Sequence, residues 1–284
     1  MTSSLGALDV ELYSDIVRSA LSEDLGQGDK TTKATIETGQ RGCGELRTKE
    51  WCVLAGVDIA VEVFRQIDRT VLVTNKKPDG HECSSGDLIV ALEGRADALL
   101  TAERTALNFL QRLAGIATAA RRCVKAAAGR AVILDTRKTT PMFRALEKYA
   151  VRAGGAANHR FSLDDGLLIK DNHVRLAGSI STAVSRVRAG RVNMAIEVEA
   201  QNLTEVDEAL ESGVDIILLD NMALDELREA ITRCRGRVMT EVSGGVTLER
   251  IDELAALRPT YISVGSLTHS AAAIDMSLDI RSVP

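Results

Sequence analysis

Six times in the second half of this chain, a short apolar run ends abruptly in a polar or charged cluster. The runs and the residues that follow them are Val132–Leu134 before Asp135, Leu167–Ile169 before Lys170, Ala195-Ile196 before Glu197, Ile216–Leu219 before Asp220, Val238-Met239 before Glu241, and Tyr261–Val264 before Gly265. Continuous apolar runs are typical of buried parallel strands, and helical periodicity between them predicts βα units. Because chemistry in such folds lies at the carboxyl ends of the strands, the six clusters predict an active site.

The length of this βα region limits the architecture. It runs from about residue 115 to about residue 270, whereas a complete eight-fold barrel needs roughly 250 residues. Six strands therefore predict either an incomplete α/β (TIM-like) barrel or an open doubly wound sheet, and the order of the elements leaves both open.

The first part of the chain has a different pattern. Helical spacing covers residues 9–25 and 57–67, while 45–49 and 88–92 have the character of strands. This mixture predicts an α+β region with antiparallel pairing. A strong helical pattern over 96–113 then carries the chain into the second region.

Composition excludes several classes of protein. The chain has 45% hydrophobic residues and a net charge of −5, which argues against a general binder of nucleic acid or of anionic membranes. Its five cysteines are scattered and form no C-x-x-C pair, so reduced cytosolic thiols are expected rather than disulfides or a zinc site. No apolar run has the length of a membrane span, and Met1–Gly6 lacks the pattern of a signal peptide. A cytoplasmic protein is expected.

Basic residues form three clusters, and two of the clusters lie directly at predicted strand ends. The clusters are Arg137 and Lys138, with Lys148 and Arg152 on the following helix; Asn158, His159 and Arg160; and Lys170 with His173. Converging Arg and Lys side chains bind carboxylates and phosphates through charge-assisted hydrogen bonds, which predicts a polyanionic substrate. The alternative is that each cluster is a solvated surface charge.

Two acids, Glu199 and Asp220, lie at neighbouring predicted strand ends. Paired acids can act as general acid and base, accept hydrogen bonds from ribose hydroxyls, or bind Mg²⁺, and they can also be structural partners of nearby bases. Their spacing does not resemble an all-protein metal cage, so magnesium carried by a phosphorylated substrate is the expected form.

Two glycine-containing turns, Ser243-Gly244-Gly245 and Val264-Gly265-Ser266, close the last two predicted strands. Glycine lets backbone N–H groups approach an anion, and late strand ends of barrels often hold a phosphate in this way. Ordinary tight turns are the alternative. The pattern assigns none of the four histidines, His81, His159, His173 and His269, as a general base.

Nine motifs together resemble one family. They are Glu23-Asp24-Leu25-Gly26-x-Gly28-Asp29-x-Thr31-Thr32, Thr101–Asn108, Asp135–Pro141, Asn158-His159-Arg160, Leu168–His173, Glu197-Val198-Glu199, Leu219-Asp220-Asn221, Ser243-Gly244-Gly245 and Gly265–His269. The chain resembles quinolinate phosphoribosyltransferases, also called nicotinate-nucleotide pyrophosphorylases (carboxylating), over nearly its whole length. One departure is Met142-Phe143, where members often have Gly-Leu.

The resemblance implies a fold, an assembly and a reaction. The fold is an N-terminal α/β sandwich over 1–112, rejoined by 272–284, and an incomplete α/β barrel over 113–271. Members form a head-to-tail homodimer or a multiple of it, and each barrel mouth faces the partner's N-terminal domain. The reaction joins quinolinate to phosphoribosyl pyrophosphate with Mg²⁺ and gives nicotinate mononucleotide, pyrophosphate and carbon dioxide.

The resemblance also implies roles for individual residues. Those expected to hold the quinolinate carboxylates are Arg104, supplied by the partner subunit, with Arg137, His159 and Arg160. Those expected to act on the reacting groups are Lys138 and Lys170 toward quinolinate and pyrophosphate, and Glu199 and Asp220 toward ribose and Mg²⁺. Those expected to complete the substrate site are Thr136, His269 and the 5-phosphate loops Ser243, Gly244, Gly245 and Val264, Gly265, Ser266.

Two other functions remain open at this stage. A different phosphate-binding barrel, such as an aldolase, would use Lys170 to form a Schiff base with a carbonyl substrate. A polyanion-binding or transport-associated module would bind phosphoribosyl pyrophosphate without turning it over.

Overall fold

The structure is a computed structural model that describes residues 5, 6 and 8–283. The expectation about Met1–Gly6 therefore falls mostly outside the described residues. The chain divides into two compact units. One comprises residues 1–121, 140–155 and 270–284, and the other comprises residues 122–139 and 156–269.

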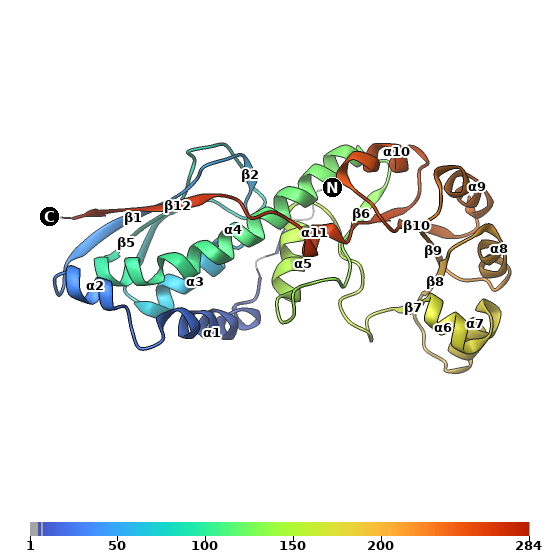
Figure 1. The fold of residues 1–284 in the computed structure, drawn as a ribbon, viewed down its shortest axis with the longest axis horizontal. Helices are drawn as coiled ribbons and strands as arrows, with labels where there is room; N and C mark the ends of the chain where they lie inside the picture. The colour runs from blue at the N-terminus through green and yellow to red at the C-terminus, as the bar shows by residue number, and fades with distance from the viewer. Residues whose placement is uncertain (1–4, 7, 284) are drawn as a thin grey trace. The chain divides into compact units, whose positions relative to one another are not determined.

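The first unit contains an antiparallel sheet. Its elements are η1 (Val10–Leu12), α1 (Ser14–Leu25), α2 (Lys30–Thr35), β1 (Arg41–Thr48), β2 (Cys52–Val53), α3 (Val57–Ile67), β3 (Leu72–Lys76), β4 (Glu82–Cys83), β5 (Leu88–Arg95), most of α4 (Ala96–Ala127), α5 (Arg144–Ala153) and β12 (Met276–Ser282). The strand order is β12-β1-β5-β3, so the last strand of the chain lies beside the first (Figure 1). The predicted α+β region with antiparallel pairing is confirmed, and the predicted helix 57–67 has the same bounds.

Helix α4 is longer than the pattern over 96–113 predicted. Small residues explain how it packs within the first unit. A Cβ on Gly115 would lie 2.0 Å from the carbonyl oxygen of Ala272, and a Cβ on Gly154 would lie 2.4 Å from that of Ala117. Neither position can carry a side chain without moving backbone, so α4 makes close contact with the segment before β12 and with the end of α5.

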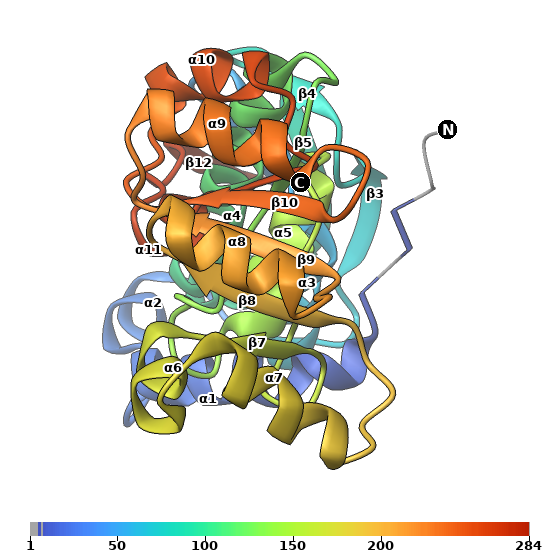
Figure 2. The same ribbon diagram turned by 90° about the vertical axis from the view of Figure 1, so that its right-hand side faces the viewer.

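The second unit is a parallel sheet with helices between its strands. Its elements are β6 (Val132–Leu134), β7 (Leu167–Ile169), α6 (Asp171–Ala177), α7 (Ile180–Ala189), β8 (Ile196–Ala200), α8 (Leu203–Glu211), β9 (Ile216–Asp220), α9 (Leu224–Cys234), β10 (Met239–Ser243), η2 (Leu248–Arg250), α10 (Ile251–Ala256), β11 (Tyr261–Ser263) and α11 (Ser266–His269). All six predicted strands are present, and α7, α8 and α9 lie on the outer side of the sheet (Figure 2).

The strand order distinguishes the two predicted architectures. The order is β6-β11-β10-β9-β8-β7, so each strand from β7 to β10 pairs with the next one in the chain, and β11 pairs with β6. Among the described residues, β6 and β7 do not pair with each other. A doubly wound sheet would instead reverse its order partway across. The link from β6 to β7 passes through α5, which belongs to the first unit. The fold is therefore an incomplete barrel. It is open between β6 and β7, the two strands whose connecting helix belongs to the other unit.

Two strands extend further than the apolar runs indicated. Strand β8 continues through Glu197 and Glu199, and β10 continues through Glu241 to Ser243. Residues two apart in a strand point to the same face, and all three acids are buried. The apolar runs therefore predicted β8 and β10 too short, because a charged side chain inside the barrel interrupts the run without ending the strand, whereas Glu199 does lie near the end of β8.

The departure from the family pattern at Met142-Phe143 falls in the first unit. Met142 has a φ of 66°, in the left-handed region that favours glycine, and its side chain is exposed. The ring of Phe143 stacks on Phe109, with 5.7 Å between the ring centroids. The substitution therefore adds backbone strain at Met142 and an aromatic contact beside it.

Two further expectations concern cysteines and membrane spans. All five cysteines are free, and four of them are buried. Burial raises the pKa of the Cys123 thiol to about 11, which keeps it protonated and unreactive. Within the part of the chain that the structure describes, no helix is both long and apolar enough to cross a membrane.

Candidate active site

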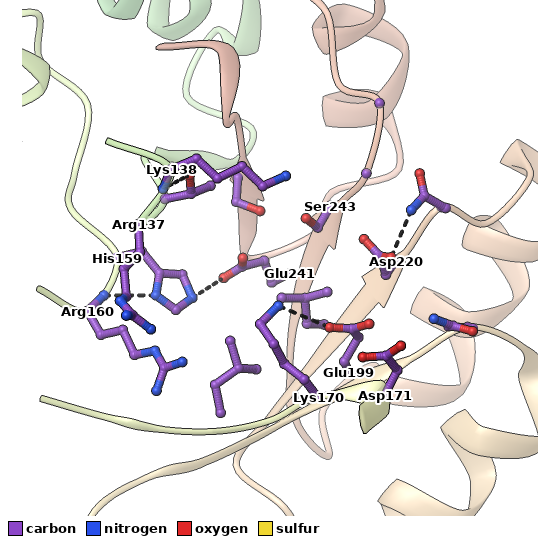
Figure 3. A pocket seen from close by; sticks show the side chains of 18 residues that line it. Arg137, Lys138, His159, Arg160, Lys170, Asp171, Glu199, Asp220, Glu241 and Ser243 are labelled. Atoms are coloured by element: carbon purple, nitrogen blue, oxygen red, sulfur yellow. Dashed lines mark hydrogen bonds and ion pairs between the residues drawn. The ribbon is translucent and has the colours of Figure 1, made fainter. Parts of the chain in front are cut away.

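A cavity of about 750 Å³ lies at the carboxyl ends of the strands of the second unit (Figure 3). Eleven residues named from the sequence line it: Thr136, Arg137, Lys138, His159, Arg160, Lys170, Glu199, Asp220, Ser243, Gly244 and Gly245. They come from five of the six strand ends and from the segment 156–160. The parallel topology brings them together, because it places all strand ends at one rim.

The loop after β6 presents Lys138. Its backbone N–H donates to Oγ1 of Thr136 (3.1 Å), and its carbonyl accepts from Oγ1 of Thr268 (2.8 Å). A Cβ on Gly265 would lie 3.3 Å from Cδ of Lys138 and 3.4 Å from Nε2 of His269. The segment 264–269 thus packs behind Lys138 and fixes the loop that carries it.

Two guanidinium groups form the adjoining wall. Arg160 donates from Nη1 to the carbonyl of Gly166 at 2.8 Å, and Nε of Arg137 is buried with no hydrogen-bond partner among the described residues. Burial and the like charge of Arg137 lower the pKa of Arg160, whereas Glu197 opposes that shift. These two guanidinium groups are partly buried and repel each other. A ligand with more than one carboxylate could pair with both of them.

The segment 158–160 is fastened at its start. Asp135, at the end of β6, is completely buried. It accepts hydrogen bonds from Nδ2 of Asn158 (2.6 Å) and from the backbone N–H of His159 (2.8 Å). These contacts hold His159 and Arg160 at the rim without using either side chain.

His159 points inward, toward two buried acids. Its Nε2 lies 3.2 Å from Oε2 of Glu197. The same Nε2 lies 3.5 Å from Oε2 of Glu241, and Nδ1 accepts the backbone N–H of Arg160 at 2.8 Å (Figure 3). Burial, and after it the charge of Glu197, raise the pKa of Glu241 to about 8. The structure thus places a mixed cluster of one imidazole and two carboxyls beneath the cationic wall.

The opposite side of the cavity is acidic. Glu199 accepts a hydrogen bond from Nζ of Lys170 at 3.1 Å, and Asp220 accepts one from Nδ2 of Asn221 at 2.8 Å. Asp171 also lines the cavity. These side chains are hard oxygen donors, which suit Mg²⁺. Among the described residues they form no group of three ligand atoms close enough to hold an ion alone, so they fit a magnesium ion that a substrate also binds.

The turn after β10 allows a close backbone approach. Gly244 has a φ of +88°, and a Cβ there would lie 2.3 Å from Oδ1 of Asn221. Gly245 is also left-handed, at +56°. Only glycine fits at position 244, and both glycines line the cavity, as expected of a phosphate-binding turn.

Several residues named from the sequence do not line the cavity. They are Arg104, which is exposed on α4 in the first unit, and Val264, Gly265, Ser266 and His269, which lie behind Lys138. Lys148 is fully buried in α5, and Arg152 lies on the same helix. His173 accepts the backbone N–H of Lys170 at 2.9 Å and so caps α6.

Sequence reasoning missed the buried support of the site. Asp135, Glu197 and Glu241 appeared only as members of motifs, with no role assigned. A signal was present for two of them. Glu197 lies two positions before Glu199 and Glu241 two positions before Ser243, so each shares the inward face with a residue of the site.

Comparison with known families agrees with this geometry. Residues 29–114 match the family described as "Quinolinate phosphoribosyl transferase, N-terminal domain", and residues 116–279 match "Quinolinate phosphoribosyl transferase, C-terminal domain". A barrel mouth with a cationic wall, an acidic wall and a glycine turn defines an α/β-barrel that binds substrates carrying several anionic groups. The chain belongs to the quinolinate phosphoribosyltransferase family.

Individual relatives match over nearly the whole chain. The probable nicotinate-nucleotide pyrophosphorylase (carboxylating) of Bacillus subtilis is 42% identical over 91% of this chain and 90% of its own length. The nicotinate-nucleotide pyrophosphorylase (carboxylating) of Mycobacterium leprae is 41% identical over 94% and 96%. The crystal structure of NadC from Streptococcus pyogenes covers 98% of this chain and 100% of its own, with 40% identity and a TM-score of 0.94.

Proposed function

We propose that this chain transfers the phosphoribosyl group of phosphoribosyl pyrophosphate to quinolinate and releases pyrophosphate and carbon dioxide, giving nicotinate mononucleotide for NAD biosynthesis. The observation that carries the proposal is one cavity with a wall of cations, an opposite wall of acids and a glycine turn at its rim. Quinolinate supplies two carboxylates for the cations, and the ribose supplies hydroxyls and a 5-phosphate for the other features.

The chemistry follows from where charge changes. When pyrophosphate leaves the anomeric carbon, positive charge develops on the ribose, and Glu199 and Asp220 can stabilise it directly or through the ribose hydroxyls. The pyridine nitrogen attacks that carbon. The ring nitrogen then carries a positive charge, which stabilises the electron pair left on the adjacent ring carbon when its carboxylate departs as carbon dioxide. A proton from water then adds to that carbon and gives the product.

The basic residues have two tasks in this proposal. Arg137, His159 and Arg160 orient the carboxylates of quinolinate, and Lys138 and Lys170 face the carboxylates and the departing pyrophosphate. Glu199 and Asp220, together with substrate oxygens, would hold Mg²⁺, which neutralises charge on the pyrophosphate when it is bound. The turn 243–245, which lines the cavity, would hold the 5-phosphate, while the segment 264–269 packs against Lys138.

We further propose a head-to-tail homodimer, or an assembly of such dimers, in which Arg104 enters the partner's cavity. Arg104 is exposed on α4, which carries it in the first unit, whereas the cavity is lined by residues of the second unit. The second unit also exposes large apolar side chains near β7, with Leu163 at 71% and Leu176 at 86%. Exposed apolar residues of this size near an open barrel edge are typical of an interface. We place the enzyme in the cytoplasm, which suits its free cysteines.

The structure gives the aldolase alternative little support. A Schiff-base lysine must lose its charge, which burial promotes. The Lys170 side chain is 48% exposed and its Nζ lies 3.1 Å from the carboxylate of Glu199, so it is not the buried lysine that this chemistry needs.

The direct test is turnover. The purified protein is incubated with quinolinate, phosphoribosyl pyrophosphate and MgCl₂, and carbon dioxide and nicotinate mononucleotide are measured. We expect the two products in equal amounts, and none with Asp220→Asn within the same time. Binding of phosphoribosyl pyrophosphate without either product would support the non-enzymatic alternative and overturn the proposal.

A further inference from the structure

The buried cluster of His159, Glu197 and Glu241 lies under the cationic wall, and the proposed function leaves both acids without a role. Glu197 and Glu241 are 6% and 2% exposed. One carboxyl oxygen of each has no hydrogen-bond partner among the described residues. Burying incompletely satisfied acids costs stability, so their presence calls for a reason beyond packing.

The hydrogen bonds of His159 fix which ring nitrogen carries the proton. Its Nδ1 accepts the backbone N–H of Arg160, so Nδ1 must present a lone pair. The hydrogen of the neutral ring is then on Nε2, which faces Glu197 at 3.2 Å and Glu241 at 3.5 Å. The two acids therefore favour the tautomer with its hydrogen on Nε2. This tautomer leaves the lone pair of Nδ1 free to accept the backbone N–H of Arg160.

The same observation argues against a metal ion in this cluster. The three ligand atoms lie within 4.8 Å of one another, which is close enough for an ion. A histidine that binds a metal through Nε2 normally donates its Nδ1–H to an acceptor. Here Nδ1 meets a donor, so a hydrogen on Nδ1 would oppose the N–H of Arg160.

We propose that Glu197 and Glu241 are positioning residues of the quinolinate pocket, which act through His159 to hold Arg160 in place. The inference rests on the proposed function and adds a specificity device to it. Asp135, at the end of β6, accepts the backbone N–H of His159. Glu197 on β8 and Glu241 on β10 face Nε2 of the same residue and hold its ring.

The device matters because a dicarboxylate needs two guanidinium groups at set positions. Bidentate recognition of a carboxylate depends on the direction of the planar fork and not only on its charge. If the ring of His159 turned, Arg160 would lose the acceptor of its backbone N–H. The loss should appear in quinolinate binding and spare phosphoribosyl pyrophosphate.

The test uses two substitutions at one position. Glu197→Leu removes the acceptor and the charge, whereas Glu197→Gln keeps an oxygen that can accept from Nε2. We expect Glu197→Leu to raise KM for quinolinate roughly tenfold, as when a buried donor loses its acceptor. KM for phosphoribosyl pyrophosphate should stay within about twofold of its original value. Glu197→Gln should recover most of the loss, and Glu241→Leu should have a smaller effect because Glu241 is the more distant acceptor.

A double-mutant cycle tests whether the effect passes through His159. In a His159→Ala background, Glu197→Leu should add less than about twofold to KM for quinolinate, since coupled residues are not additive. A full additional effect there would show that Glu197 acts directly, and the proposal would fail. Asp79→Asn is the matched control, because Asp79 is a partly buried acid of the first unit that accepts from Tyr149 at 2.7 Å. It should lower the melting temperature and leave the ratio of the two KM values unchanged.

Two further measurements separate this inference from the proposed function. Calorimetric titration with quinolinate reports on the pocket even if the wild-type protein gives no nicotinate mononucleotide. Equal quinolinate affinity for the wild-type, Glu197→Leu and Glu241→Leu proteins would overturn the inference, whatever the turnover. Equilibrium dialysis against Zn²⁺ or Mn²⁺ should find no ion that Glu197→Gln releases, and stoichiometric binding lost in that variant would favour a metal centre instead.

Discussion

The two walls of the cavity are held in different ways. On the basic wall, the segment that carries Arg160 is tied to Asp135, and the His159 ring on it faces Glu197 and Glu241, all three acids being deeply buried. On the acidic wall, Glu199 and Asp220 each accept one side-chain hydrogen bond among the described residues, from Lys170 and Asn221, and both donors line the cavity. The basic wall is thus fixed before a ligand arrives, while the acids can exchange partners when one does.

This difference matches the timing of charge in the reaction. The carboxylates of quinolinate are present before the reaction begins, so a wall with fixed geometry can select them. The positive charge on the ribose exists only near the transition state, and interactions that strengthen there raise kcat. The basic wall should therefore control specificity, and the acidic wall should control rate.

The largest expected effect concerns the basic wall. Nicotinate, which lacks one carboxylate, should not replace quinolinate. We expect kcat/KM to fall by roughly 1,000-fold or more, because a site built for a polar group rejects an analogue without it. Formation of nicotinate mononucleotide from nicotinate with phosphoribosyl pyrophosphate measures the loss, and comparable turnover of the two acids would remove the basis for assigning specificity to this wall.

The acidic wall should respond in kcat. Asp220→Asn and Glu199→Gln keep the shape of the side chain and lose its charge. Each should lower kcat by about 100- to 1,000-fold, the usual cost of removing one group that stabilises transition-state charge. KM for quinolinate should change much less. Steady-state kinetics with both substrates separates the two quantities, and a variant that keeps its kcat and raises only KM would reverse the assignment.

A smaller effect tests whether the basic wall is completed by a second subunit. Arg104→Ala and Lys138→Ala proteins should each be nearly inactive as homodimers. Refolded together, they should form mixed dimers in which one site carries both changes and the other carries neither. Up to about half of the wild-type activity per mixed dimer should return, because separate sites act independently.

Two tags purify the mixed dimers and establish that they form. The matched control mixes Lys138→Ala with Lys170→Ala, two changes on the same side of the interface, which cannot restore an intact site. Activity in the control mixture, or inactive Arg104/Lys138 mixed dimers, would place Arg104 outside the partner's cavity.

The smallest effect concerns stability and pH. The pKa of Glu241 is raised to about 8 from an ordinary value of 4.5, by burial and by Glu197, with His159 opposing. The folded protein therefore holds this proton more tightly than the unfolded chain. Its contribution to stability is complete below pH 4.5 and is lost as pH rises through about 8. Glu241→Gln does not titrate, so its melting temperature should fall by a few degrees less than that of the wild type over this range. Parallel melting curves against pH would contradict the assignment of the proton to Glu241.

Much of the fold was predictable from local pattern. The six parallel strands were visible because a strand buried on both faces is mostly apolar. Helix 57–67 was visible because one face of it is buried and the other is not. The end of α4 was not predictable, because glycine is a weak helix former and Gly115 therefore indicates a helix end. Only the close approach of the Ala272 backbone shows why a glycine lies within this helix.

The sequence by itself determined which chemical groups the site contains: the cations at 137, 138, 160 and 170, the acids at 199 and 220, and the glycine turn at 243–245. Tertiary structure decided which of them meet, because contacts between residues far apart in the chain depend on strand order and register. It also decided the role of Glu197 and Glu241. An acid within a strand reads as the end of an apolar run, and only the position of the His159 ring between two strands shows what such an acid holds.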